Sequence, residues 1–239
     1  MKLSILIPVY NEEDTIYELL ELVHQVDLDD CKKEIIVIND RSTDASVKKI
    51  KAFMKKYPKS KIVFINDGVH RGKGGGIKEC MKRSTGDVCI IQDADLEYTP
   101  LDYQSIIDKF KTQKVNAVYG SRILGRKSFG NYYSNFAFFV GGVALTNICN
   151  LFFGTKITDE STCYKAFRRN MIPKILSFSK RDDFAFEIEL TYVLGREGKI
   201  VEVPVRYFPR SITSGKKIRA KDFFIAVLTI LQCKYDNRV

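Results

Sequence analysis

Asp93 and Asp95 lie two residues apart, directly after the apolar run 87–92. Two carboxylates at the end of a strand can share one hard divalent cation, and the oxygens of a diphosphate can complete its shell. A cation held in this way offsets the negative charge that builds on a departing nucleoside diphosphate. The spacing therefore indicates metal-assisted transfer from a nucleotide, and the alternative is a pair of acids in a surface turn.

Apolar runs alternate with segments of helical periodicity along the first half of the chain. The strand-like runs are residues 3–9, 34–38, 61–66 and 87–92, and the helical segments are residues 12–26, 43–57 and 74–84. Such alternation requires crossover connections, and it predicts an α/β fold with a mainly parallel, twisted sheet flanked by helices. Ligands of these sheets bind beyond the carboxyl ends of the strands, where Asp93 and Asp95 are expected.

The second half of the chain continues the same domain. Its expected elements are helices at 102–111, 184–195 and 222–233, strands at 117–120, 163–167 and 199–206, and an aromatic-rich apolar stretch at 129–153. No internal repeat or low-complexity linker separates the two halves. We therefore expect a single domain over residues 1–239, whose second half completes a site for an acceptor.

Two other strand ends carry side chains that suit a nucleoside. Tyr10 can stack on a base, and Glu12 can hydrogen-bond to a base or a ribose. The alternative for this segment is a turn with Asn11 as a helix N-cap and acids in the first helical turn. After the second strand, Asp40 could accept a hydrogen bond from a ring N–H of uracil or guanine, whereas Asp44 fits a capping or turn position better.

The glycine-rich segment 70–76 stands between a strand and a helix. Glycines let backbone N–H groups approach phosphates, and a helix N-terminus attracts anions. The segment lacks the spacing of a P-loop, and no Ser or Thr follows Lys73; it also has Ile77 where a dinucleotide fingerprint needs a small residue. An NAD-dependent oxidoreductase remains a distant alternative, because Asp93 and Asp95 follow at about the distance of a ribose-binding acid.

The chain is basic, with 39 Lys and Arg against 29 Asp and Glu and a net charge of +10. This excess suggests an anionic partner such as nucleotide phosphates or a phospholipid surface. Nucleic acid is not the expected partner, because the sequence contains no recognised binding module for it. The six cysteines form no CxxC pair, and the apolar run at the N-terminus is too short for a signal peptide, so we expect reduced thiols and a cytoplasmic protein.

Several motifs in their order resemble those of glycosyltransferase family 2, whose members have the Rossmann-like GT-A fold. They are residues 8–12, 39–44, 72–76 and 93–95, followed by residues 120–122, 158–169, 184–189 and 202–207. Within the family, the chain is most similar to the dolichyl- and polyprenyl-phosphate sugar transferases. The resemblance implies an inverting, metal-dependent enzyme that moves a hexose from a UDP- or GDP-sugar to a lipid phosphate. Residues 1–100 would bind the nucleotide sugar and residues 101–239 the acceptor.

On the donor side, the resemblance implies roles for residues from both halves. Those that would hold the nucleotide sugar are Pro8, Tyr10, Glu12, Asp40, Lys73, Asp93, Arg210 and Lys216. Those that would bind Mg²⁺ or Mn²⁺ are Asp93, Asp95 and Glu97, and the family often has Gln at the last position. Arg210 and Lys216 match a basic loop that closes over the diphosphate, although the Gly and Ser spacing in 210–216 departs from the family pattern.

On the acceptor side, the resemblance implies that Arg122 binds the acceptor phosphate and that Asp159 lies beside the reacting sugar. A phosphate monoester is already ionised at pH 7, so it needs cations to position it more than it needs a base. Residues 120–158 agree, because they contain no acid. If the acceptor were instead a hydroxyl of a glycan or a protein, a base such as Asp159 would become obligatory.

Residues 136–153 carry no charge over 18 residues, near the lower limit for crossing a membrane. Asn147, Asn150 and a glycine pair argue against a simple span. We expect the stretch 129–153, together with the helix at 222–233, to lie at a membrane interface beside the lipid acceptor. The protein would then be peripheral on the cytosolic face, held also by its positive charge. The alternative is a buried helix and an aromatic-rich loop.

Overall fold

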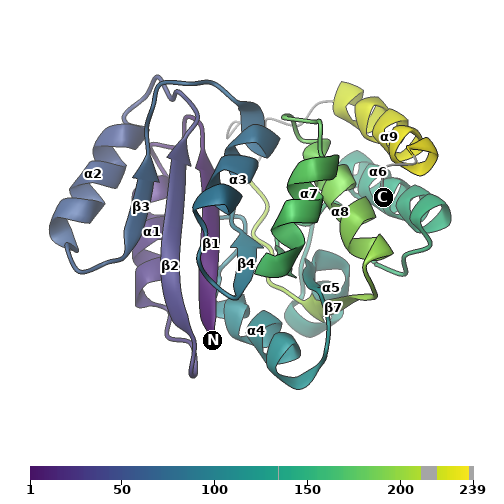
Figure 1. Ribbon diagram of the computed structural model, residues 1–239, viewed down its shortest axis with the longest axis horizontal. Helices are drawn as coiled ribbons and strands as arrows, with labels where there is room; N and C mark the ends of the chain where they lie inside the picture. Colours follow the sequence, from purple (N-terminus) through teal and green to yellow (C-terminus); the bar gives the residue numbers. More distant parts are fainter. Residues whose placement is uncertain (134, 211–219, 237–239) are drawn as a thin grey trace.

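The computed structural model describes residues 1–133, 135–210 and 220–236 (Figure 1). Its centre is a sheet whose seven strands, in this part of the chain, follow the order β3-β2-β1-β4-β6-β5-β7. The first half is parallel: β1 (Lys2–Val9) pairs with β2 (Lys32–Asn39) and β4 (Val88–Ile91), and β2 pairs with β3 (Ile62–Ile65). The expected parallel sheet of the first half is confirmed.

The second half of the sheet contains one reversed strand. β6 (Lys165–Arg168) lies antiparallel between β4 and β5 (Ala117–Ser121). β5 in turn pairs in parallel with β7 (Ile200–Pro204) at the edge. The sheet is therefore mixed but mostly parallel. The carboxyl ends of β1, β2 and β4 lie next to one another at the same end of the sheet.

The register of β1 explains why its apolar residues form a strand. Ile5 faces Ile35 of β2 on one side and Ile90 of β4 on the other, and all three side chains are buried. A central parallel strand is covered on both faces, so a continuous apolar run suits it better than an alternating one.

Helices cover both faces of the sheet (Figure 1). α3 (Gly72–Arg83) crosses β1 and β2 on the near face and contacts α7 (Ile172–Phe178) and α8 (Phe186–Arg196). Behind the sheet in this view lies α1 (Ile16–Gln25), which packs against α2 (Ser46–Lys56). α4 (Tyr103–Thr112), which follows the short turn η1 (Pro100–Asp102), packs beside β5 and β7.

Two short helices were not expected from the sequence. α5 (Arg122–Phe129) begins at the end of β5, where the Ser121 hydroxyl accepts a hydrogen bond from the Leu124 amide, and it ends at Gly130 with φ 71°. α7 follows β6 through the turn η2 (Arg169–Met171). Both are short, so their sequences hold too few turns to give a clear helical period.

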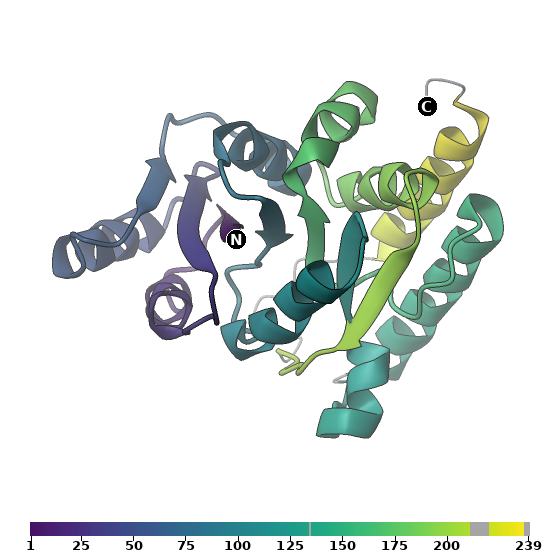
Figure 2. The same ribbon diagram turned by 60° about the horizontal axis from the view of Figure 1, so that its bottom comes forward.

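The apolar stretch at 129–153 divides at Asn135, whose side chain caps α6 (Phe136–Phe153). By length and composition, α6 could cross a membrane, and only 17% of it is buried in the domain. Its buried side, with Leu145 and Cys149, packs on α8 and on α9 (Ala220–Tyr235). Figure 2 shows α6 and α9 side by side, away from the parallel strands. The alternative of a simple buried helix therefore does not describe α6.

The start of β2 is fixed by a buried carboxylate. Glu34 accepts hydrogen bonds from the Thr85 amide at 2.6 Å, the Thr85 hydroxyl at 2.7 Å and the Gly86 amide at 3.1 Å, and it also pairs with Lys2. Burial alone would raise the pKa of Glu34, but the contacts with Lys2, Ser4 and Thr85 lower it to about 2. The ionised form is therefore the one that joins β1, β2 and the turn before β4.

We expect Glu34→Gln to lower the free energy of unfolding at pH 7 by about 1–3 kcal/mol, because a buried charged partner of several donors is lost. The pKa of Glu34 is below its usual value of 4.5, so its contribution is complete above pH 4.5 and disappears as the pH falls towards 2. Urea unfolding between pH 2.5 and 7 measures this. A difference between wild type and variant that stays constant over the range would contradict the assignment.

Candidate active site

The loops after β1 and β2 are hydrogen-bonded to each other at the open edge of the sheet. The Asn11 side chain accepts from the Thr43 amide at 2.8 Å, and the Asp44 carboxylate accepts from the amides of Glu13 and Ser46, both at 3.0 Å. Asn11 adopts a left-handed conformation with φ 50°, so it does not serve as the expected N-cap of the first helix. Asp44 is a turn and capping residue, as expected.

Asp40 directly follows β2 and contacts the start of α3. Its carboxylate accepts hydrogen bonds from the amides of Arg71 and Gly72 at the start of α3, and it lies 3.0 Å from Nδ1 of His70. The Tyr10 ring lies beside His70, with 5.7 Å between the ring centroids. Tyr10 is exposed, as stacking on a base would require, whereas the oxygens of Asp40 are already used by the backbone of α3.

The turn after β4 carries backbone strain. Leu96, between Asp95 and Glu97, has φ 60°, which is unusual for a residue with a large side chain. An oxygen of Asp95 accepts from the Glu97 amide at 3.1 Å and stabilises the turn. Strained residues of this kind persist where the surrounding structure determines them, and they concentrate at ligand sites.

Two basic residues face the paired aspartates. Nζ of Lys73 lies 2.8 Å from Oδ2 of Asp93, and Nη2 of Arg210 lies 3.1 Å from Oδ2 of Asp95. Burial raises the pKa of both aspartates, and the neighbouring acids Asp95 and Glu97 raise it further, while Lys73 and Arg210 oppose the shift. The site therefore concentrates carboxylates that gain from a nearby cation.

Arg210 also reaches the first strand end. Its guanidinium donates to both carboxylate oxygens of Glu12, at 3.0 and 3.2 Å. The Arg210 amide donates to Glu97 at 2.9 Å, and the Tyr207 hydroxyl donates to the other oxygen of Glu97 at 3.1 Å. The segment after β7 therefore lies along residues 93–97, the candidate metal turn. Lys216 falls outside the described residues, so its expected place beside Arg210 stays a prediction.

No three His, Cys, Asp or Glu side chains gather into a ready-made metal site anywhere in the described ranges. The three expected ligands Asp93, Asp95 and Glu97 therefore do not converge as a set, and a cation held by the two aspartates would need further oxygens, such as those of a diphosphate. Asp93 and Asp95 both follow β4, and each forms an ion pair with a basic side chain, Lys73 or Arg210. The donor set therefore fits a hard divalent ion that binds together with a nucleotide.

The glycines of α3 serve packing with the segment before α8. A Cβ on Gly72 would stand 2.5 Å from the backbone oxygen of Asp182, and one on Gly74 would stand 2.8 Å from that of Asp183. The amide of Gly75 donates to the Asp182 oxygen at 3.2 Å. The glycines thus let the segment before α8 approach α3 closely. Close to this contact, Nζ of Lys73 lies 2.9 Å from the Glu187 carboxylate.

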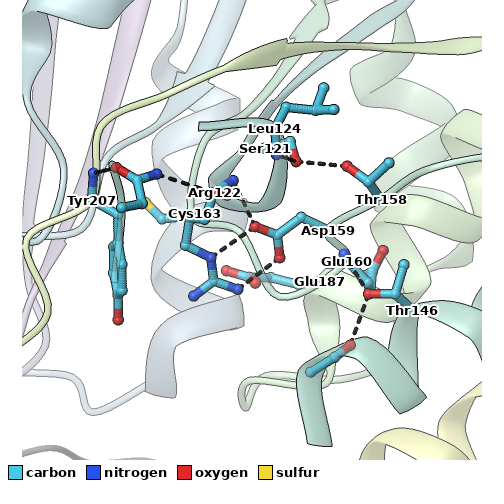
Figure 3. A network of polar contacts seen from close by, with 12 residues as sticks. Ser121, Arg122, Leu124, Thr146, Thr158, Asp159, Glu160, Cys163, Glu187 and Tyr207 are labelled. Atoms are coloured by element: carbon cyan, nitrogen blue, oxygen red, sulfur yellow. Dashed lines mark hydrogen bonds and ion pairs between the residues drawn. The ribbon is translucent and has the colours of Figure 1, made fainter. Parts of the chain in front are cut away.

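A second polar cluster lies at the start of α5 (Figure 3). The Asp159 carboxylate accepts from the Arg122 amide at 2.9 Å, from Nε at 2.8 Å and from Nη2 at 2.7 Å. Burial alone would lower the pKa of Arg122, but Asp159 raises it well above its usual value. The Tyr207 ring lies 5.2 Å from the guanidinium carbon. Arg122 is therefore a fixed, fully charged cation.

Glu202 of β7 holds the loop that carries Asp159. It accepts from the amide and hydroxyl of Thr158 at 2.8 and 3.1 Å, and from the Asp159 amide at 3.2 Å. Tyr207 then contacts both Arg122 and Glu97, so it connects the cluster of Arg122 and Asp159 to the candidate metal turn. The sequence reasoning gave no individual role to Glu187, Glu202 or Tyr207. All three lie in the motif segments 184–189 and 202–207, but a motif does not name the partner of each side chain.

Residues 4–176 match the sequence model described as glycosyl transferase family 2. The chain belongs to this family. Its sequence is similar to two curated members over most of its length. It is 27% identical to a dolichol-phosphate mannosyltransferase of Pyrococcus furiosus over 231 residues, and 26% identical to a dolichyl-phosphate β-glucosyltransferase of Dictyostelium discoideum over 222 residues. These alignments cover 94% and 86% of this chain but 61% and 66% of the relatives, which are longer proteins.

Solved structures of glycosyltransferases share the fold. A glucosyl-3-phosphoglycerate synthase of Mycobacterium tuberculosis, in complex with Mn²⁺, UDP and phosphoglyceric acid, superposes with a TM-score of 0.70 at 18% identity and covers 100% of this chain and 81% of the other. A mannosyltransferase of Pyrobaculum calidifontis in complex with GDP-mannose and Mn²⁺ superposes with a TM-score of 0.64 at 18% identity and covers 97% of this chain and 62% of the other. The family 2 enzyme described here therefore has the GT-A fold, as expected.

We expect Gly74→Ala to destabilise this family 2 enzyme by about 1–3 kcal/mol, because the added methyl group meets the backbone of Asp183 and overpacks the junction of α3 and α8. Gly141→Ala is the matched control: it also lies within a helix, but nothing stands within 4 Å of its added Cβ, so it should be neutral or slightly stabilising. Thermal unfolding compares the two. Equal effects would mean that the glycines of α3 do not serve packing.

Proposed function

We propose that this family 2 glycosyltransferase moves a hexose from a UDP- or GDP-sugar to a polyprenyl or dolichyl phosphate, with inversion at the sugar. The observation that carries the proposal is the similarity, over 94% and 86% of the chain, to relatives named for dolichol-linked phosphate acceptors. A second support is the buried cation Arg122, which lies in a segment without acids between β5 and Asp159.

On the donor side, residues at the ends of β1, β2 and β4 would bind the nucleotide sugar. Tyr10 is exposed beside His70 and would stack on the base, while Glu12 and Asp40 line the same edge. Asp93 and Asp95, with Glu97 close by, would hold Mg²⁺ or Mn²⁺, which when bound offsets charge on the diphosphate. Lys73, Arg210 and Lys216 would then contact diphosphate oxygens.

On the acceptor side, Arg122 would position the lipid phosphate. One phosphate oxygen attacks the anomeric carbon, and the bond between that carbon and the donor diphosphate breaks with its electron pair on the leaving diphosphate. No proton has to move, because the attacking oxygen is already ionised. Residues 1–100 would thus serve the donor and residues 101–239 the acceptor, with Arg210 crossing between them.

A glycan or protein hydroxyl as acceptor would require Asp159 to remove a proton. Its carboxylate receives three hydrogen bonds from Arg122, and the loop beneath it is held by Glu202. A base would have to give up part of this arrangement in every turnover. The geometry therefore favours a role for Asp159 in orienting Arg122, and with it the phosphate acceptor.

Attachment to a membrane would use the outer sides of α6 and α9. Phe136 and Leu151 of α6, and Phe224 and Leu228 of α9, leave most of their side chains exposed. Large apolar side chains gathered on two neighbouring helices are typical of an interfacial surface. Peripheral binding at the cytosolic face would bring Arg122 close to the phosphate of a membrane-embedded acceptor.

The transfer reaction is tested by incubating the protein with Mn²⁺ and labelled UDP- or GDP-hexoses. One series contains polyprenyl phosphate and a second contains oligosaccharides or a peptide. We expect labelled lipid product in the first series, and hydrolysis by a β-glycosidase would show its anomeric configuration. Product on a hydroxyl acceptor, and none on the lipid phosphate, would contradict the proposed acceptor.

We expect Asp95→Asn to lower the rate of transfer by about 100-fold or more, since metal stabilisation of the leaving diphosphate contributes several kcal/mol. The fold should remain, because Asp95 lies in the turn after β4 and is not part of the apolar core. Activity and circular dichroism are measured together. Loss of both would instead give Asp95 a structural role.

We expect the double substitution of Phe224 and Leu228 by Ser to weaken binding to phosphatidylserine vesicles about tenfold or more, because two apolar side chains no longer enter the interface. Leu101→Ser is the control, since Leu101 is 66% exposed, like Phe224 at 67%, but lies on η1. Sedimentation with vesicles measures binding. Equal loss in both variants would argue against α9 as the contact.

A further inference from the structure

Lys73 is shared between two acids. Its ammonium nitrogen lies 2.8 Å from Asp93 and 2.9 Å from Glu187. Asp93 belongs to the turn after β4, whereas Glu187 lies in the first turn of α8. One cation therefore bridges the proposed metal turn and a helix from the other half of the chain.

Glu187 is held firmly from its other side. Its second carboxylate oxygen lies 3.5 Å from Nζ of Lys165, a fully buried residue of β6. Lys165 is fixed in turn by Glu160, at 2.9 Å from its carboxylate and 2.6 Å from its backbone oxygen. Charges alternate along the row Asp93, Lys73, Glu187, Lys165 and Glu160. Glu187 has a cation on each side.

The helix that carries Glu187 packs directly against the helix that carries Lys73. Residues 182–186 lie directly against the glycines of α3, which is the helix that carries Lys73. The close approach of the two backbones leaves no room for even a methyl group at Gly74. This packing therefore sets the separation of the two backbones at Lys73 and Glu187. The position of the ammonium between Asp93 and Glu187 depends on the Lys73 side chain, which is long enough to turn.

A divalent cation bound at Asp93 would stand close to the ammonium of Lys73, and like charges at this range repel strongly. Lys73 then has to leave Asp93, and a buried ammonium without a counter-charge is unfavourable. Glu187 offers that counter-charge, because its carboxylate already lies 2.9 Å from the Lys73 ammonium. Lys82, which lies further along the same helix, pairs with Glu79, and among the described residues no second acid pairs with it.

We propose that Glu187 is a positioning residue that retains Lys73 when Asp93 passes from Lys73 to the divalent cation. This inference rests on the proposed function of the metal turn. Lys73 and the cation compete for Asp93, and Glu187 weakens that competition by holding the ammonium. After the exchange, Lys73 stays beside the site, where it faces the diphosphate of the donor.

The proposal makes two substitutions act in opposite directions on Mn²⁺ affinity. Lys73→Met removes the competitor, so Mn²⁺ should bind about fivefold or more tightly. Glu187→Gln leaves Lys73 with Asp93 alone, so Mn²⁺ should bind about tenfold more weakly. In the double variant no ammonium remains to be retained, so the loss of Glu187 should have little further effect.

Binding of Mn²⁺ without nucleotide is measured by electron paramagnetic resonance of the free ion, which needs no catalytic activity. Lys82→Met and Glu79→Gln are controls that change the net charge by the same amounts on α3, and both should bind Mn²⁺ like the wild type. Thermal unfolding checks each fold. If Glu187→Gln does not fold, Glu187→Asp replaces it, since Asp keeps the charge beside Lys165 and shortens the reach to Lys73.

The outcomes separate this inference from the function on which it rests. Opposite shifts in the single variants and a small effect in the double variant support it. If the wild type binds Mn²⁺ but both variants bind it more weakly, the metal turn stands and the role of Glu187 is wrong. If the wild type binds no Mn²⁺, with or without UDP or GDP, the metal assignment is wrong and this inference with it.

Discussion

The site depends on keeping several carboxylates together at one partly buried edge of the sheet. Glu12, Asp93, Asp95 and Glu97 gather there because the ends of parallel strands meet. Carboxylates that lose water and face one another are unfavourable unless cations accompany them. The chain supplies these cations from distant elements: Lys73 from α3 and Arg210 from the segment after β7. The positions of Lys73 and Arg210 beside Asp93 and Asp95 therefore follow from the need to balance these negative charges.

The path of the segment after β7 follows from the same need to place a basic side chain beside the carboxylates. After β7, residues 206–210 return across the domain and are held by Asp102, Glu97 and Glu12 in succession. Tyr207 is placed on this path between Glu97 and Arg122. The strand ends that carry Glu12 and Glu97 are therefore joined to the Arg122–Asp159 cluster by side chains of one short segment.

The sequence predicted the parallel half of the sheet well, since β1, β2 and β4 are continuous apolar runs that have few alternative positions. It also placed Asp93 and Asp95 at a strand end. It could not predict that β6 is antiparallel, because direction depends on the connection and not on the four residues of the strand. The sequence could not predict the partners of Glu187 and Glu202 for a related reason. An acid in an apolar element indicates a buried pair, but the partner lies on another element. The glycines of α3 indicated phosphate binding, whereas their neighbours in space show that they allow close packing.

The polar residues of α6 were expected to argue against a simple membrane span, and the structure gives Asn150 and its neighbour Thr146 a physical task, whereas Asn147 is exposed. Asn150 accepts from the Ile157 amide at 3.0 Å and donates to the Ile157 oxygen at 2.8 Å, and the Thr146 hydroxyl accepts from the Glu160 amide at 3.0 Å. These contacts tie α6 to the loop that carries Asp159. If α6 left the domain to cross a bilayer, the amides of that loop would lose their partners and the polar side chains would enter hydrocarbon unpaired. The inner side of α6 is thus held by the loop that carries Asp159, while Phe136 and Leu151 leave most of their side chains exposed. These contacts favour a helix that stays packed on the domain over one that passes through a bilayer.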